Sequence, residues 1–227
     1  MTLRARVEQA LGTVYDPELD EPITTLGFVG SCVVTGDDVA VRLRLPTPQC
    51  APNFAFLMAA DASTAVRALP EVGEVTIELV DHYTGAEINA AVCRGAGFDS
   101  AFPGETAGDL DALRELFQRK ALLARQARVC QALLADGASA AEIVALRVPD
   151  LPDSIDAVRC LELRDALGHG RAPDAPALVA GDGGPLDAGG LLTWLRRARL
   201  VSLSLETNGS MCRDLLRNRY GEEVAAA

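Results

Sequence analysis

Residues 28–45, FVGSCVVTGDDVAVRLRL, carry the pattern that decides the fold of the first part of this chain. Within residues 39–45 apolar side chains alternate with Ala40 and two arginines, which is the period of a strand with one buried face. Gly36-Asp37-Asp38 separates this run from the apolar run before it, and these residue types favour a tight turn. The stretch therefore predicts a β-hairpin that packs one face against a core.

Helical patterns lie on both sides of the hairpin. Residues 2–14 place apolar side chains at spacings of three and four, and Asp16-Pro17 ends that helix because proline cannot continue its hydrogen-bond ladder. The later elements expected here are a helix over 53–69, a strand over 72–80, and a helix that a capping box at Thr84–Glu87 begins.

This order of elements predicts an α+β fold. Residues 1–98 are expected to form a small α/β domain, in which packed helices cover a three-stranded sheet, and residues 99–108 (DSAFPGETAG) have the composition of a linker. From 109 to 227 the period is helical almost throughout, which predicts an all-helical C-terminal domain. Its expected helices cover 110–135, 139–146 behind a second capping box at Ser139–Glu142, 154–167, and 191–219 as one helix or two.

Composition and charge exclude several classes of function. The 227 residues are 49% hydrophobic and 23% charged, as in an ordinary globular protein. The 32 acidic residues outnumber 21 basic ones, and this net charge of −11 disfavours a nucleic-acid or anionic-membrane partner. No stretch reaches the roughly 18 apolar residues that span a bilayer. The N-terminus has the pattern of an amphipathic helix and lacks a cleavage site, so we expect a cytoplasmic protein without a membrane partner.

Cys50 is the cysteine in a chemically distinctive position. No cysteine lies in a C-x-x-C pair, which disfavours a zinc ribbon, a two-cysteine redox motif and a disulfide framework. Cys50 follows a strand and precedes a helix with Pro52 in its first turn, where unpaired N–H groups and the helix dipole favour a thiolate. We therefore predict a reactive or metal-binding thiol at Cys50. The other five cysteines, expected to be small buried side chains, are Cys32, Cys93, Cys130, Cys160 and Cys212.

Three motifs around this cysteine resemble a known family. Asp16-Pro17-Glu18, then TLGFV at 25–29, then LPTPQCAP at 45–52 stand in the order and spacing of the small iron–sulfur cluster assembly domain shared by SufT- and PaaD-like proteins. The resemblance covers residues 3 to about 93. It implies a non-catalytic maturation factor that assembles, carries or delivers iron or an iron–sulfur cluster to a client metalloenzyme, or that works with the assembly machinery.

The resemblance also implies a set of site residues. Cys50 matches the family's cysteine and Thr47 its loop threonine, both as cluster-binding residues, and Cys50, Asp16 and Glu18 match the expected metal ligands. Thiolate is a soft ligand for iron, and carboxylates add harder oxygen ligands. One thiolate is too few for a cluster, which usually takes four protein ligands, so we expect transient binding or a metal shared within a homodimer. Asp16 and Glu18 also have a purely structural interpretation, as caps of a turn.

The chain departs from the family pattern in three places. Thr25 stands where an acidic residue precedes Leu-Gly, Ala51 follows the cysteine so that proline is displaced to Pro52, and Asp81-His82-Tyr83-Thr84 replaces a proline–tryptophan element. These changes leave the fold expectation intact, put metal binding in question and indicate a specialised branch. Residues 50–55, together with the helical extension, resemble assembly-type proteins encoded beside bacterial soluble di-iron monooxygenases.

Other interpretations remain open. The chain fits a metal-free, chaperone-like adaptor, and a thiol enzyme would need His82 as its base. A helix-turn-helix is disfavoured because residues 139–147 offer only Arg147 as a cation. Near the C-terminus Asn208 and Cys212 lie four residues apart, on one helix face, where a structural explanation is favoured over a ligand site.

Overall fold

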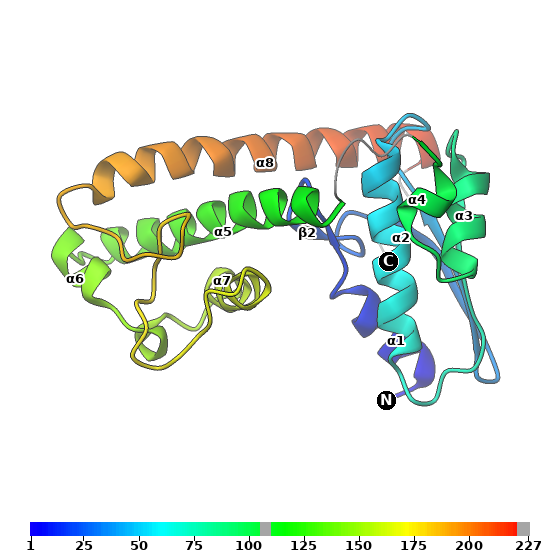
Figure 1. The fold of residues 1–227 in the computed structure, drawn as a ribbon, viewed down its shortest axis with the longest axis horizontal. Coiled ribbons are helices and arrows are strands. Elements are labelled where there is room, and N and C mark those ends of the chain that lie inside the picture. The colour runs from blue at the N-terminus through cyan, green and yellow to red at the C-terminus, as the bar shows by residue number, and fades with distance from the viewer. Residues whose placement is uncertain (105–109, 222–227) are drawn as a thin grey trace. The chain divides into compact units, whose positions relative to one another are not determined.

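The computed structural model describes residues 1–104 and 110–221, and it confirms the predicted fold class. A three-stranded mixed sheet with packed helices is followed by a helical region (Figure 1). Of the expected linker, residues 105–108 lie outside the described residues. The domain boundaries expected on either side of it stay a prediction.

The contacts of the chain divide it into two compact units. One unit, called here the α/β unit, holds the described residues up to Leu110 together with those from Thr207 onward. The other, the helical unit, is Asp111–Glu206. The described residues from Thr207 onward therefore pack with the first part of the chain.

The sheet of the α/β unit has the strand order β3-β4-β5. β3 (Val29–Thr35) pairs antiparallel with β4 (Asp38–Arg44), and β4 pairs parallel with β5 (Val75–Val80). The predicted hairpin is thus confirmed. Its turn contains Gly36 at φ +66°, a left-handed backbone conformation that glycine adopts without a steric penalty.

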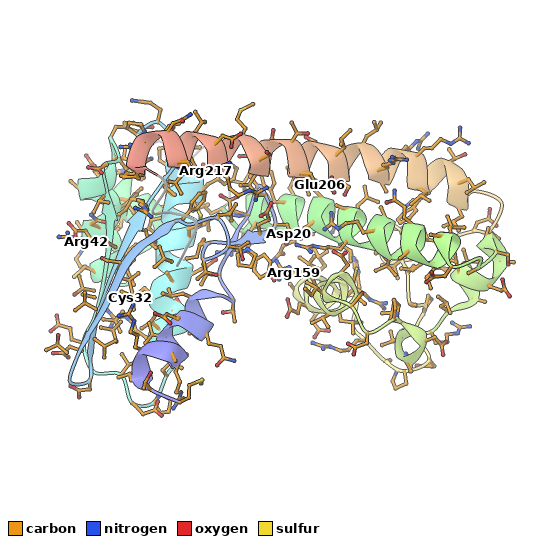
Figure 2. All side chains as sticks on the ribbon, turned by 180° about the vertical axis from the view of Figure 1, so that it is seen from behind. Asp20, Cys32, Arg42, Arg159, Glu206 and Arg217 are labelled. Carbon is orange, nitrogen blue, oxygen red and sulfur yellow. The ribbon has the colours of Figure 1, made fainter. Side chains whose placement is uncertain are left out.

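One face of the sheet packs against the core and the other is open to solvent. On β4 the side chains of Val41 and Leu43 are buried, and that of Arg42 between them is exposed. Figure 2 labels Arg42, which forms an ion pair at 2.8 Å with Glu78 of β5 on the open face. The predicted alternation therefore separates the core side of this sheet from its solvated side.

Helices cover the core face of the sheet. α2 (Pro52–Arg67) and α3 (Gly85–Cys93) contact β5 and each other, and α1 (Leu3–Leu11) contacts β3 and α2 (Figure 1). Leu11 at the end of α1 has no exposed side-chain area. A short helix, α4 (Phe98–Ala101), forms where the linker was expected to begin.

A small strand pair that the sequence did not predict surrounds the Asp-Pro-Glu motif. β1 (Tyr15–Asp16) pairs antiparallel with β2 (Glu21–Pro22). Between them the chain turns through Asp20, which takes a left-handed φ of 52°. Asp16 is thereby fixed at the start of a tight turn.

The helix predicted after β5 begins at the expected place, but the predicted capping box is wrong. Thr84 is the N-cap residue of α3, and its side chain makes no capping hydrogen bond. Its Oγ1 lies instead 3.1 Å from Nδ1 of His82. The Thr84 backbone, at φ −110° and ψ 22°, is not in the extended conformation that a capping residue usually adopts.

The helical unit contains the predicted helices. Its elements are α5 (Leu110–Ala135) from Asp111 onward, α6 (Ala140–Ala145), the 3₁₀ turn η1 (Val148–Asp150), α7 (Ile155–Ala166) and the first part of α8 (Leu191–Tyr220). The capping box of α6 is confirmed, since Ser139 Oγ accepts from the Glu142 N–H and the Glu142 carboxylate accepts from the Ser139 N–H. α8 is a single helix.

The core of the helical unit includes buried polar groups that organise a loop. Gln126 accepts a hydrogen bond from the Val179 N–H at 2.7 Å and donates one to the Val179 carbonyl at 3.0 Å. The Arg164 guanidinium donates to the carbonyls of Pro176 and Ala177.

Among the described residues no helix is both long enough and apolar enough to cross a bilayer.

Candidate functional site

Cys50 lies in the loop between β4 and α2. Ala51 is the N-cap residue of α2, and Pro52 is its first residue. No side chain caps this end of the helix, so the positive end of its dipole is directed at the loop. The Cys50 side chain is half-buried. The predicted position, a partly accessible thiol at a helix N-terminus, is what the structure contains.

Thr47 lies beside the thiol. Its Oγ1 is 3.5 Å from the Cys50 Sγ, and the Gln49 N–H donates to the same oxygen at 3.2 Å. A hydroxyl oxygen can accept one hydrogen bond while its proton is donated to another group. Either group can be the donor in this contact, and the Thr47 hydroxyl donates when Cys50 is a thiolate. The structure brings these two predicted residues together.

His82 fixes the main chain at Cys50. Its Nε2 lies 2.8 Å from the Cys50 carbonyl oxygen, which can only accept, so Nε2 carries the proton. Nδ1 accepts from the Thr84 N–H at 3.3 Å. Burial lowers the pKa of His82, and this outweighs the hydrogen bond to Cys50, which raises it. Both ring nitrogens are engaged away from the thiol, an arrangement that does not fit a base acting on Cys50.

Asp16 stabilises the turn in which it lies by accepting hydrogen bonds from main-chain N–H groups of that turn. Its Oδ1 accepts from the N–H groups of Glu18 at 2.8 Å and Leu19 at 2.9 Å, and only 7% of the residue is exposed. Burial raises the pKa of Asp16 to about 6, although these two hydrogen bonds oppose the rise. Glu18 is exposed. The structural interpretation of Asp16 is therefore realised, and Glu18 is the more accessible carboxylate.

Cys212 belongs to the same compact unit as Cys50, which the sequence did not show. It is half-buried on α8 and packs against the hydrophobic core to which Cys50 also packs. Burial, together with smaller contributions from Asp16, Cys50 and Glu18, raises the pKa of Cys212 to about 11. The spacing of Asn208 and Cys212 was the available signal, but it does not say what this helix face contacts.

The donors near Cys50 are too few for a complete metal centre. In the part of the chain that the structure describes, no group of three or more His, Cys, Asp or Glu side chains is placed to hold a metal ion. The α/β unit contains the half-buried thiols of Cys50 and Cys212 and the exposed carboxylate of Glu18. A donor set of this kind suits partial ligation of a soft or borderline metal.

The sequence of the α/β unit matches a known protein family. Residues 4–78, which run from α1 into β5, match the iron–sulfur cluster assembly protein family. This part of the chain therefore matches the family that the motifs around Asp16, Thr25 and Cys50 implied.

A curated relative has a name in keeping with this family. The iron–sulfur cluster carrier protein of Deinococcus radiodurans is 34% identical to this chain over 83 residues, which are 37% of this chain. The chain spans only 22% of the length of that relative. No solved structure matches the chain significantly.

Proposed function

We propose that this protein assembles, carries or delivers iron or an iron–sulfur cluster to a client enzyme, with the thiolate of Cys50 as the sulfur ligand. The metal is cargo in this proposal and is held only until it is handed over. The observation that carries the proposal is the half-buried thiol of Cys50 at an uncapped helix N-terminus. The Thr47 hydroxyl is within hydrogen-bond distance of its sulfur, and His82 is hydrogen-bonded to its main-chain carbonyl. The family match and the carrier relative support the same function.

The supply of ligands favours a homodimer. A cluster usually takes four protein ligands, and one Cys50 thiolate gives one of them. Two chains that bring their Cys50 loops together would share the cargo and could release it by separating. We propose Glu18 as an additional oxygen ligand because it is exposed. Asp16 could be a ligand as well, but its Oδ1 would then give up the hydrogen bonds from the Glu18 and Leu19 N–H groups that hold the turn.

The partner is a client metalloenzyme or the assembly machinery. From the resemblance of residues 50–55 and the presence of a helical region, we propose a di-iron monooxygenase system as the client. None of the six cysteines, all of which lie in the described residues, forms a disulfide, which suits a reducing compartment such as the cytoplasm.

Anaerobic reconstitution with iron and sulfide tests the proposed function. The wild-type protein is expected to gain bound iron and thiolate-to-iron absorption, and Cys50→Ser is expected to lose most of both. Cys93→Ser is the matched control, because Cys93 is an exposed cysteine at the end of α3. Equal uptake by Cys50→Ser and wild type would contradict the proposal. A wild-type protein that takes up no iron would favour a metal-free adaptor.

A further inference from the structure

The α/β unit contains a pocket of about 440 Å³ on the helical side of the fold. One face of α2, between Phe56 and Arg67, forms part of its wall, and the end of α3 with residues 94–97 forms the rest. These two helices contact each other (Figure 1). Pockets that bind small molecules have volumes of roughly 300–1,000 Å³, so this pocket is large enough for one.

The charged groups in the wall of the pocket are both positive. Among the described residues that line it, Arg67 and Arg94 carry charge and none is acidic. Elsewhere in the α/β unit Arg42 pairs with a carboxylate, whereas neither lining arginine has a carboxylate partner in the part of the chain that the structure describes. The pocket is therefore a positively charged site on a chain whose net charge is −11.

Arg67 is held in place by uncharged partners. Its Nε donates to the Ser63 Oγ at 3.1 Å, and its Nη2 donates to the Val75 carbonyl at 2.9 Å. Ser63 itself is buried in α2. The third nitrogen of the guanidinium, Nη1, has no hydrogen-bond partner among the described residues. The guanidinium is thus fixed before any ligand arrives, and N–H groups on Nη1 remain to be used by an acceptor.

Much of the remaining wall is apolar. Phe56 and Val92 belong to the buried core and border the pocket, and Ala60 and Ala96 add small apolar side chains. A mostly apolar wall with a few placed polar groups is typical of small-molecule sites. This lining suits an organic anion, because guanidinium groups form strong hydrogen bonds with carboxylate and phosphate oxygens while the body of the molecule covers the apolar wall.

We propose that this pocket binds a small organic anion, a carboxylate or phosphate group on an apolar body, whose charge is held by Arg67 and Arg94. The inference goes beyond the proposed function. The pocket does not include Cys50, which lies before the first residue of α2, whereas Arg67 is the last residue of that helix. Binding of the anion and binding of iron are therefore separate properties of the α/β unit.

Protection of Cys93 tests the proposal, because this exposed thiol lines the pocket. The anionic probes are phenyl phosphate and phenylacetate, and phenylacetamide is the matched neutral probe. A saturating anionic probe is expected to slow alkylation of Cys93 by iodoacetamide several-fold and to leave alkylation of Cys50 unchanged, whereas phenylacetamide is expected to protect neither cysteine. Peptide mass spectrometry follows both cysteines in the same sample, and the more protective anion identifies the group that the pocket prefers.

Two substitutions test the arginines by isothermal titration with the more protective probe. Arg94→Gln removes a charge that has no carboxylate partner among the described residues, so we expect the fold to be kept. We expect Arg94→Gln and Arg67→Gln each to weaken binding by about tenfold, because a hydrogen bond to a charged group is lost. The control is Arg42→Gln, which removes a positive charge from the open face of the sheet and is expected to bind the probe like wild type.

The inference is overturned if the anionic probes protect Cys93 no better than phenylacetamide does, or if both lining variants bind the probe as tightly as wild type. The two arginines would then act only as charges that suit the negative ends of α2 and α3, where Arg67 lies in the last turn and Arg94 is the C-cap residue. Cys50→Ser is expected to bind the probe like wild type, so this site and the proposed function can fail independently.

Discussion

The imidazole of His82 donates a hydrogen bond from Nε2 to the main-chain oxygen of Cys50 at 2.8 Å. A second bond beside it, from the Tyr83 N–H to the Pro48 carbonyl at 3.2 Å, joins the same two segments. The loop that carries the thiol is therefore held by the residues that follow β5 as well as by α2.

Replacing the imidazole is expected to loosen this loop. His82→Ala removes the bond to Cys50, which we expect to cost about 1 kcal/mol of unfolding free energy. We also expect several-fold faster alkylation of Cys50 by iodoacetamide, because the loop opens more often. Urea titration and mass spectrometry measure the two effects. Tyr83→Ala is the control, since that side chain is 55% exposed; equal labelling rates in all three proteins would show that other contacts hold the loop.

The Thr47 hydroxyl is expected to promote the reactivity of the thiol. Thr47→Val keeps the shape of the side chain and removes the donor that lies 3.5 Å from the Cys50 sulfur. A thiolate that loses a hydrogen bond is less stabilised, so alkylation of Cys50 should slow. Thr47→Ser restores the hydroxyl and should restore the rate. If the Val variant reacts as fast as wild type, the hydroxyl does not act on the sulfur.

The buried carboxyl of Asp16 is expected to make stability depend on pH. Its pKa of about 6 in the folded protein lies above the ordinary value near 3.8, so the folded state binds the proton more tightly than the unfolded state. The unfolding free energy should therefore fall as pH rises from about 4 to about 6, and should level off above that range.

Asp16→Asn isolates this effect. The amide oxygen can still accept from the N–H groups of Glu18 and Leu19, and it carries no charge. We expect the unfolding free energy of the variant to exceed that of wild type by on the order of 2 kcal/mol at pH 8, and to equal it at pH 4. Urea titrations at the two pH values measure the difference, with Glu18→Gln as an exposed control. A difference that is the same at both pH values would exclude the charge of Asp16 as its cause.

Much of the fold could be predicted because its elements have clear periods. The alternation along β4 and the Gly36 turn define the hairpin, and α5 occupies the residues that its helical period indicated. The strands β1 and β2 are two residues each, which is too short to show a period in the sequence. Only their antiparallel pairing in the structure identifies them. The capping motif at Thr84 failed because the Thr84 backbone is not in the extended conformation that a capping residue usually adopts, which the motif does not show.

The candidate site could be predicted only where its residues are local in sequence. Thr47 and Cys50 are three residues apart in one loop, and their motif indicated the contact. Cys212 lies on a helix whose period shows which face is buried but not what covers it. Its placement depends on tertiary contacts such as that of Arg219 with Leu45.

The end of α8 is expected to stabilise the α/β unit specifically. Leu216 has no exposed area and belongs to the core of that unit, whereas its neighbour Leu215 is 39% exposed. Leu216→Ala should cost about 2–4 kcal/mol through the cavity that it leaves, and Leu215→Ala much less. All three tyrosines lie in the α/β unit, and the single tryptophan, Trp194, lies in the helical unit, so tyrosine absorbance and tryptophan fluorescence follow the two units separately. In urea, Leu216→Ala should move the tyrosine transition to lower concentration by more than it moves the tryptophan transition. A tyrosine transition that stays at its wild-type midpoint would mean that the last turns of α8 contribute nothing to the unit that carries Cys50.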